Sequence, residues 1–387
     1  MTHAALRSVR IAGLTSIDEL TLELSTPVTV LIGPNGSGKS NVVGALELLG
    51  RIIDGQLQDT IVRRGGFANI LHRSRRPGES AEQVSITVWG EETDRLANGY
   101  EVVLHQAIDD RAILSEKVFI HDRENYPRPY DRDLGLSPES RLRLAAGDEN
   151  QRIAGIAKHV VPILTACRVF HFHDTSADAP VKRRVDDADN LTLAPDARNL
   201  APLLARLRIE NLVRYQRIIR AIRTVAPFFD DFVLEPEAGR MRLRWQEKGL
   251  DDVFSADGLS DGTLRFICLA VLLLQPECPG TIVLDEPELG LHPFAINQLA
   301  NLIRRAAVDG RKVVLATQSV TLLSHFEAGE VAVVERGAHG TQVSRLDPAR
   351  LSEWLADYSL GELWEKNLLG GRPRPDSAAP PREVSDR

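Results

Sequence analysis

Short runs in which apolar and polar residues alternate fill the first third of the chain. Turn residues separate these runs, which predicts β-strands. We expect strands at residues 6–11, 20–24, 28–32, 84–89, 100–108 and 113–121. A helix-like run at 41–49 follows the third strand after a glycine-rich loop. The last three strands follow one another closely, so they predict an antiparallel layer beside the core.

The pattern becomes helical between residues 196 and 225, where arginine is frequent. At about 100° per residue, apolar side chains fall on one side of this stretch and arginines on the other. The side expected to pack consists of Leu212, Tyr215, Ile218, Ile219, Ile222 and Val225. Beyond it, strands expected at 240–245, 281–284, 313–316 and 331–334 have helices between most of them. This alternation predicts a parallel sheet with covering helices.

Two segments have compositions that do not suit a hydrophobic core. Residues 123–147 contain several prolines among many charged residues, so we predict a loop or mobile connection there. Residues 370–387 combine prolines with almost no large apolar side chain, which is typical of a disordered tail.

Composition narrows the class of protein. Hydrophobic residues make up 43% of the 387 residues, yet no run approaches the ~18 apolar residues of a membrane span. The first ten residues lack the apolar core of a secretory signal, so we expect a soluble, cytoplasmic protein without a membrane partner. The 3 cysteines show no Cys-x-x-Cys spacing and predict neither disulfides nor a zinc site. With a net charge of −7, any contact with nucleic acid would need a local basic patch.

The glycine-rich loop after the third strand fits the phosphate-binding pattern G-x-x-x-x-G-K-[ST]. Its glycines let backbone N–H groups face an anion, and the helix that follows adds its positive N-terminus. Lys39 would reach the β- and γ-phosphates and Ser40 would ligate Mg²⁺. A glycine-rich turn without a ligand is the alternative. The nucleotide-binding residues we expect are Gly33, Pro34, Asn35, Gly36, Ser37, Gly38, Lys39, Ser40 and Asn41.

A second part of the expected site follows the apolar run 281–284, which ends in two acidic residues. A buried parallel strand would deliver both carboxylates at the sheet edge where the glycine loop emerges. Asp285 would hold Mg²⁺, directly or through water, and Glu286 would orient and activate the attacking water. The alternative is a strand followed by an ordinary acidic turn.

A third part, Leu-Ser-Asp-Gly at 259–262, precedes the apolar helix expected at 266–274. With it, the order of motifs resembles the ATPase heads of the ABC superfamily, above all the RecF/SMC-like and OLD-like AAA branch. Residues 11–17, 259–266 and 288–293 carry this resemblance, and 358–367 look like a stand-alone group of predicted ATPases within the branch. The resemblance spans about residues 5–370.

The resemblance implies an α/β fold: a P-loop NTPase head of the ABC type over 1–369, with a mixed sheet, an antiparallel β layer and an inserted helical subdomain at 190–228. It also implies a composite ATP site. Two subunits would meet face to face on binding ATP, and Ser260 and Gly262 of one would cap the γ-phosphate held by the other. This homodimer would separate after hydrolysis. By itself, Ser-Asp-Gly could be an ordinary helix start.

Departures from the pattern also matter. Gln318 stands where ABC transport subunits usually carry a histidine. It can hydrogen-bond a phosphate or water but cannot take up a proton, so we expect it to contribute to slow turnover. The glutamine that links the loop to the partner domain stays open among Gln56, Gln58, Gln83 and Gln106. His171 and His173 would share one face of a strand, and we favour a polar cluster near the head or its dimer surface over a metal site.

Arginines supply candidates for contact with nucleic acid, because they can neutralise phosphates. A solvated face or an acidic partner protein would suit them as well. The candidates are Arg206, Arg214, Arg217, Arg220 and Arg223, with only Glu210 expected nearby, together with Arg63 and Arg64.

We therefore expect an ATP-binding and ATP-hydrolysing switch with ATP and Mg²⁺ as cofactors. About 220 residues separate Lys39 from Leu259, too few for a long paired coiled coil. About 70 follow Gln318, too few for the nuclease domain of OLD-like proteins, so cutting DNA would need an effector partner such as a nuclease. The context we expect is DNA repair or defence against foreign DNA. The alternatives are a nucleotide-gated scaffold that recruits an effector and, third, a transporter ATPase.

Overall fold

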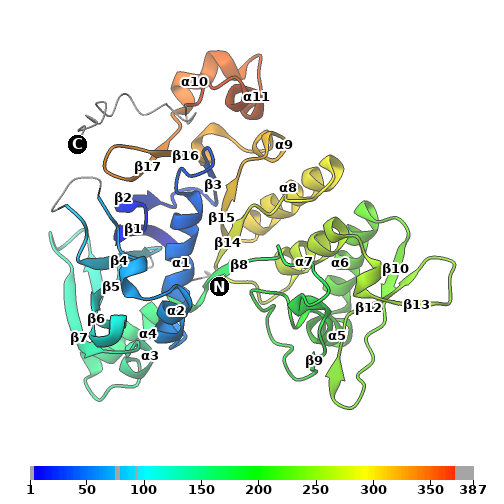
Figure 1. The fold of residues 1–387 in the computed structure, drawn as a ribbon, viewed down its shortest axis with the longest axis horizontal. Coiled ribbons are helices and arrows are strands. Elements are labelled where there is room, and N and C mark those ends of the chain that lie inside the picture. The colour runs from blue at the N-terminus through cyan, green and yellow to red at the C-terminus, as the bar shows by residue number, and fades with distance from the viewer. Residues whose placement is uncertain (1–3, 75–78, 93–94, 371–387) are drawn as a thin grey trace, which may run out of the picture.

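The computed structural model describes residues 4–74, 79–92 and 95–370. Figure 1 shows strands and α1 on one side of a central sheet and a mainly helical lobe on the other. The two large hydrophobic cores meet at this central sheet. Except for Gly370, the expected tail 370–387 lies outside the described residues. The expected single head over 1–369 stays a prediction.

The central sheet has the strand order β17-β16-β3-β15-β14-β8. Strands β16, β3, β15, β14 and β8 run parallel, and β17 pairs antiparallel with β16 at one edge. All five residues of β3 are buried, as a strand covered on both faces requires. The bounds are β3 Val28–Ile32, β8 Cys167–Phe170, β14 Thr281–Asp285, β15 Lys312–Thr317, β16 Val331–Arg336 and β17 Thr341–Arg345.

The second large sheet is antiparallel and has the order β2-β1-β4-β5-β6-β7. Buried side chains of α1 (Lys39–Ile53) belong to one core cluster with residues of both large sheets, so this helix is covered on two sides. The short helix α2 (Leu57–Arg63) and the helix α4 (Gln151–Thr165) also contribute to this core. The strands are β1 Leu6–Leu14, β2 Ile17–Glu23, β4 Gln83–Gly90, β5 Leu96–Gln106, β6 Ala112–Asp122 and β7 Tyr130–Ser137.

The loop predicted at 123–147 is wrong over much of its length, because it contains β7 and the short helix α3 (Leu142–Ala145). Strand β7 is an edge strand whose side chains are mostly exposed. Backbone pairing with β6 forms it, and such pairing needs no apolar alternation. Glu116 of β6 is fully buried and accepts hydrogen bonds from the Ser140 hydroxyl (2.6 Å) and the Arg141 N–H (2.7 Å), which fix the chain after β7.

The helical lobe contains α5 (Leu200–Glu210), α6 (Leu212–Val225) and α7 (Asp261–Leu274). The helical stretch expected at 196–225 breaks at Asn211, whose side chain caps α6. The predicted packing side of α6 is confirmed for its four central members, whereas Leu212 is 53% exposed and Val225 only partly buried. Leu212 lies in the first turn of α6, directly after the break at Asn211.

The strand expected at 240–245 is two short strands with different partners. β11 (Arg240–Met241) pairs with β9 (Val185–Asp186), whereas β12 (Arg244–Glu247) lies between β10 (Phe229–Phe232) and β13 (Val253–Ser255). The remaining helices are α8 Pro293–Val308, α9 Val320–Leu323, α10 Pro348–Leu355 and α11 Leu360–Glu365. Short 3₁₀ helices lie at Phe67–Asn69, Ile108–Asp110, Pro180–Lys182, Ala256–Gly258 and Ala328–Glu330. Within the described ranges, none of the helices is both long enough and apolar enough to cross a bilayer.

Candidate nucleotide site

The glycine loop joins the end of β3 to the start of α1, at the carboxyl edge of the parallel sheet. Gly36 and Gly38 adopt φ values of 77° and 108°, in the left-handed region that favours glycine. At Gly38 an added Cβ would lie 2.0 Å from the Thr341 hydroxyl oxygen, so only glycine fits there. The loop therefore follows the course that its sequence predicts, with its backbone packed closely against β17.

A chain of hydrogen bonds holds this loop from two distant strands. The Asn41 amide donates to Ser16 Oγ (2.6 Å), Ser16 Oγ lies 2.6 Å from Thr341 Oγ1, and Thr341 Oγ1 donates to the main-chain oxygen of Ser37 (3.1 Å). Ser16 lies in the turn between β1 and β2, and Thr341 begins β17. Sequence reasoning missed Thr341, because nothing near it in the sequence marks its role.

Lys39 is buried, and its ammonium group points back at the loop. Nζ donates to the main-chain oxygens of Gly33 (2.6 Å) and Pro34 (3.2 Å). Burial lowers the pKa of Lys39, and the nearby carboxylates of Glu286, Asp285 and Glu288 oppose this shift. The positive charge of Lys39 and the acidic residues predicted for the site thus lie close enough to interact. The neighbouring Ser40 is exposed.

Asp285 ends β14, which is one strand away from β3 across β15. Its Oδ1 atom is buried and has no hydrogen-bond partner. Burial raises the pKa of Asp285, and the charge of Glu286 adds to this effect. An unpartnered buried carboxylate oxygen fits a divalent cation, and Ser40 offers a second oxygen of the kind that Mg²⁺ prefers. Within the described residues, no group of three or more His, Cys, Asp and Glu side chains could hold a metal ion.

Glu286 and Gln318 are brought together as a pair. Gln318 Nε2 donates to Glu286 Oε1 (2.5 Å), across the edge between β14 and β15. Glu286 has a φ of 42°, which is unusual for a residue with a side chain, and its N–H donates to the Ala316 oxygen (2.8 Å). The amide of Gln318 is therefore placed to orient the carboxylate that we expect to activate water.

Glu288 is a further acidic residue at this edge, and sequence reasoning did not assign it a role. The Thr317 hydroxyl (2.5 Å) and the Gln318 N–H (3.3 Å) donate to its Oε1, while Oε2 is buried without a partner. Burial raises the pKa of Glu288. The repeated acidic residues of Glu-Pro-Glu were the available signal. Glu288 links the end of β14 to the start of the Gln318 segment.

The Leu-Ser-Asp-Gly turn opens α7 in the helical lobe, whereas the glycine loop opens α1. Ser260 is exposed and caps α7 by accepting a hydrogen bond from the Thr263 N–H (3.2 Å). Next to it, Gly262 packs on the main chain, because an added Cβ would lie 2.5 Å from the Gly290 oxygen. The turn is therefore shaped as a helix start with its hydroxyl at the surface.

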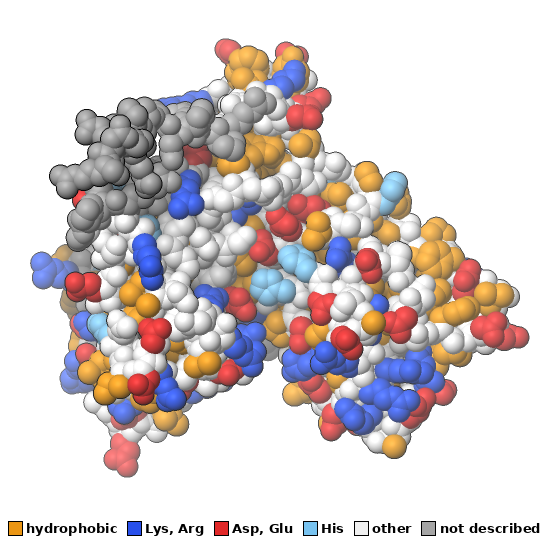
Figure 2. Space-filling view, in the orientation of Figure 1, with side chains coloured by type: hydrophobic (Ala, Val, Ile, Leu, Met, Phe, Trp, Pro, Cys, Tyr) orange, Lys and Arg blue, Asp and Glu red, His pale blue; other side chains and the backbone are white. Residues whose placement is uncertain are grey.

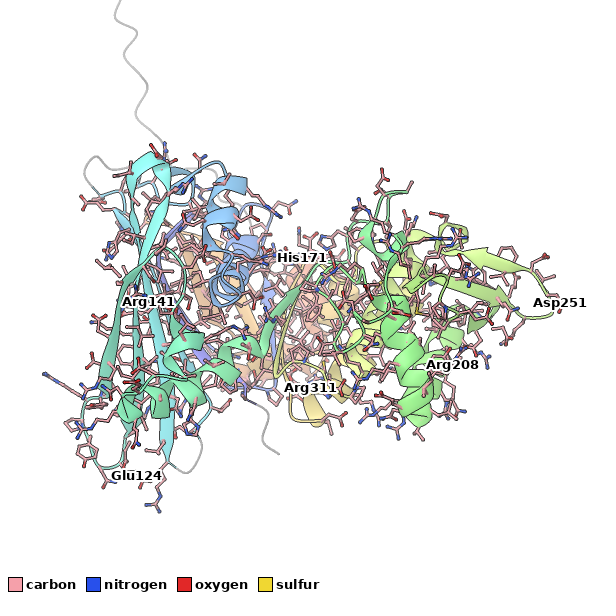
Figure 3. All side chains as sticks on the ribbon, turned by 90° about the horizontal axis from the view of Figure 1, so that it is seen from below. Glu124, Arg141, His171, Arg208, Asp251 and Arg311 are labelled. Carbon is pink, nitrogen blue, oxygen red and sulfur yellow. The ribbon has the colours of Figure 1, made fainter. Side chains whose placement is uncertain are left out.

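The two histidines lie just beyond the end of β8, and His171, labelled in Figure 3, lines a pocket between α1 and β8. Figure 2 shows histidine side chains in the hollow between the lobes. His173 Nε2 lies 2.8 Å from the main-chain oxygen of Asp285, and His171 Nε2 lies 3.8 Å from Glu47 Oε2. The interaction with His171 lowers the pKa of Glu47. These contacts describe the polar cluster that we favoured over a metal site.

The four glutamines considered for the link to the partner domain all lie on the side of the antiparallel sheet. Gln83 belongs to β4 and Gln106 ends β5. Gln58 donates to the main-chain oxygens of Ala112 and Pro138, and Gln56 accepts from Arg51. The residues that the structure brings to the acidic edge beside β8 are instead histidines.

The expectation that the arginine face meets only Glu210 is wrong. Arg206 pairs with Glu277 as well as Glu210, Arg214 lies 3.7 Å from Asp309, and Arg223 pairs with Asp230. Folding brings Glu277 and Asp309 in from distant segments, and Asp230 follows the end of α6, so helical periodicity could not reveal these pairs. Near the glycine loop's helix, Arg63 pairs with Asp59 and Arg64 lies 3.7 Å from Glu47. Within the part of the chain that the structure describes, Arg217 and Arg220 form no ion pair with an acid, and the Arg220 guanidinium donates to the main-chain oxygen of Gln216 in its own helix.

Comparison with known proteins places this site in a family. Residues 28–324 match the family described as "AAA domain, putative AbiEii toxin, Type IV TA system". The energy-coupling factor transporter ATP-binding protein EcfA2 of Lactobacillus delbrueckii subsp. bulgaricus is 34% identical over 133 residues, which are 33% of this chain and 45% of that protein. The chromosome partition protein Smc of Halothermothrix orenii is 27% identical over 77 residues, 20% of this chain and 6% of that protein. The chain thus spans less than half the length of these relatives.

Two solved structures are similar over most of the chain. The SmcHead bound to the C-winged helix domain of ScpA gives a TM-score of 0.59 at 14% identity, covering 90% of this chain and 99% of that one. The Smc head domain with an extended coiled coil, bound to the C-terminal domain of ScpA and derived from Pyrococcus furiosus, gives 0.54 at 12% identity, with 92% and 99% covered. The predicted fold class is confirmed. Because the family match spans more than half of the chain, the protein belongs to this AAA-domain family; the predicted resemblance to ABC-superfamily heads is confirmed, and the fold is that of the SMC heads.

Proposed function

We propose that this protein hydrolyses ATP as a molecular switch. The observation that carries the proposal is the meeting of three strand ends at one edge of the sheet. There Lys39 follows β3, Asp285 ends β14 with Glu286 directly after it, and Gln318 follows β15. This edge combines a cradle for phosphates, an unpartnered carboxylate for a cation and an oriented carboxylate for water.

In this proposal, the loop N–H groups and Lys39 hold the β- and γ-phosphates, with the Lys39 ammonium leaving its loop oxygens to reach them. Ser40 and Asp285 would hold Mg²⁺, which supplies charge neutralisation at the phosphates. Glu286 accepts a proton from the attacking water while Gln318 orients the carboxylate. The products are ADP and inorganic phosphate. Gln318 cannot itself take up a proton, so we expect slow turnover.

The switch would work through a homodimer formed on ATP. Ser260 and Gly262 of one subunit would complete the site held by Lys39 of the other, and the exposure of Ser260 supports this role. Glu286→Gln should bind ATP, fail to hydrolyse it and accumulate as a dimer, measured by light scattering after gel filtration. A monomeric Glu286→Gln protein at saturating ATP and Mg²⁺ would sink the dimer proposal.

The ATPase proposal itself has a direct test. Phosphate release by the wild type should depend on Mg²⁺ and fall at least about 100-fold in Lys39→Ala. Lys248→Ala is the matched control, because Lys248 is exposed and belongs to the helical lobe. Unchanged turnover in Lys39→Ala would mean that the measured activity does not come from this site.

The switch would act on or near nucleic acid in the cytoplasm, in DNA repair or in defence against foreign DNA. Arg217 and Arg220 support this part, because neither forms an ion pair with an acid among the described residues. Reversing both to glutamate should remove any DNA stimulation of ATP hydrolysis, and stimulation should weaken as salt rises. Slow turnover that DNA leaves unchanged would favour the alternative, a nucleotide-gated scaffold that recruits an effector such as a nuclease.

Two of the similar solved heads bind domains of ScpA, which supports a head that recruits another protein. We do not extend the transporter role of EcfA2 to this chain, because the matched segment is 33% of its length.

A further inference from the structure

We propose that His173 is a positioning residue for the acidic edge of the site. In this proposal its imidazole ring holds the carbonyl of Asp285 and so fixes the orientation of Glu286. The inference rests on the proposed ATPase function, since it assigns a role within that site. His173 and Glu286 lie more than 100 residues apart in the sequence, and the fold brings them together.

The contact itself defines which nitrogen carries the proton. His173 Nε2 lies 2.8 Å from the main-chain oxygen of Asp285. A carbonyl oxygen only accepts hydrogen bonds, so Nε2 must donate. The peptide group between Asp285 and Glu286 is then held at both ends, because the Glu286 N–H donates to the Ala316 oxygen (2.8 Å).

This peptide needs such support, because Glu286 is in an unfavourable conformation. Its φ of 42° lies in the left-handed region, which residues with a side chain rarely adopt. The following residue is Pro287, whose ring further restricts the residue before it. A conformation of this kind persists only where neighbouring groups hold it. Here it directs the Glu286 carboxylate to within 2.5 Å of Gln318 Nε2.

His173 is itself held in place. Its main-chain oxygen accepts a hydrogen bond from Arg265 Nη2 (2.8 Å), and Nη1 of the same arginine donates to the Leu289 oxygen (2.9 Å). Arg265 thus links the His173 segment to the turn after Glu286. His173 also lines a small cavity together with Phe172, Pro287 and the two acidic residues of the edge.

The neighbouring histidine offers a matched control. His171 lies in the same segment but interacts with Glu47 of α1, and its side chain is 39% exposed. Its ring lies 6.2 Å from that of His173, centroid to centroid. Replacing it changes the local aromatic content without touching the Asp285 carbonyl.

The experiment compares four proteins: wild type, His173→Phe, His173→Gln and His171→Phe. Phenylalanine keeps the ring but cannot donate, whereas the glutamine amide can place a donor near the position of Nε2. We expect His173→Phe to lower kcat about tenfold to 100-fold with little change in the Kd for ATP, because small misplacements of reacting groups are costly. His173→Gln should stay within about threefold of the wild type, as should His171→Phe.

Several results would overturn the proposal: wild-type kcat in His173→Phe, an equal loss in His173→Gln, or an equal loss in His171→Phe. Thermal midpoints and ATP binding of all four proteins check that they fold. A second measurement does not depend on hydrolysis. Proton–nitrogen NMR of histidine-labelled protein should show a slowly exchanging proton on His173 Nε2, and its absence also refutes the contact. If Lys39→Ala hydrolyses ATP normally, the proposed function fails, and the NMR result still decides the His173 contact.

Discussion

The glycine loop and the Leu-Ser-Asp-Gly turn have similar local sequences but differ in their contacts with the rest of the chain. Both contain serine and glycine and both precede a helix, where backbone N–H groups favour an anion. In the loop, Ser37 and Lys39 are buried. In the turn, Ser260 is exposed, and its hydroxyl contacts Thr263 in the first turn of its own helix.

The difference lies in long-range support. The glycine loop takes its shape from Ser16, in the turn between β1 and β2, and from Thr341 of β17, while three carboxylates act on Lys39. The side chain of Ser260 contacts its own helix start. Two segments with similar chemistry can therefore differ in function: one is built into its own site, and the other presents its hydroxyl at the surface. In the proposed dimer the second would serve the partner's nucleotide.

Mixing two inactive variants gives the largest effect and tests this contrast directly. Lys39→Ala should abolish hydrolysis because it removes the phosphate-binding lysine of the loop. Ser260→Arg should abolish it because the long arginine side chain blocks the surface of the turn. A mixture of the two should regain activity, because heterodimers combine an intact loop with an intact turn at one of their two sites. ATP hydrolysis by titrated mixtures measures this. A mixture as inactive as its parts would contradict a shared site.

Separating nucleotide binding from hydrolysis sharpens the same contrast. Ser260→Arg should lower turnover at least about tenfold while the monomer still binds ATP with nearly wild-type Kd, because the turn is not part of its own loop. Calorimetric titration of ATP at low protein concentration checks the Kd. Asp261→Arg, on the neighbouring exposed residue, controls for charge at this surface. A matching loss of affinity would show that the turn serves its own chain's nucleotide.

Removing the support of the loop should have a moderate effect. Thr341→Val deletes the hydroxyl that bonds the Ser37 oxygen, so we expect the KM for ATP to rise about threefold to tenfold, in line with about 1 kcal/mol for one hydrogen bond. Thr341→Ser keeps the hydroxyl and should stay close to the wild type. Steady-state kinetics distinguish the two, and equal KM values for valine and serine would contradict the role of the hydroxyl.

The smallest effect concerns stability rather than activity. Burial raises the pKa of Asp285, so the folded protein binds this proton more tightly than the unfolded chain. The contribution of Asp285 to the free energy of unfolding therefore falls as the pH rises from the ordinary pKa of an aspartate, about 3.9, through the raised pKa of the folded protein. Without nucleotide, Asp285→Asn should raise the thermal midpoint by about 1 to 3 °C at neutral pH, and the gain should vanish near pH 4. Calorimetry checks this, with exposed Asp251→Asn as control. A lower midpoint at neutral pH would mean that the carboxylate stabilises the empty site.

Local patterns predicted the elements that contain the motifs. The strand expected at 28–32 matches β3 residue for residue, because all five residues are buried and flanked by a clear loop signal. Edge strand β7 was missed, since its side chains are mostly exposed and only its backbone pairing defines it. The strand expected at 240–245 failed for a related reason, because its two halves pair with different partners.

The site shows the same division. The order of the motifs could be recognised in the sequence, and the structure brings Glu286 and Gln318 into contact. The roles of Thr341 and His173 could not be predicted, because each side chain contacts a main-chain oxygen of a residue more than 100 positions away in the sequence. The acids Glu277 and Asp309, which pair with Arg206 and Arg214, also come from distant segments and were missed as well. Sequence patterns report neighbours along a helix or strand, and these contacts depend on how the sheets are assembled.

The hydrogen bond from Thr341 to Ser37 also has a consequence for synthesis. The chain is made from its N-terminus, so the glycine loop leaves the ribosome early, 304 residues before the threonine that shapes it. Strands β14 and β15, with the acidic edge, also come late. A nascent chain therefore carries an unfinished loop until β17 has been made. Competence to hold a nucleotide would arise only when Thr341 has joined the loop.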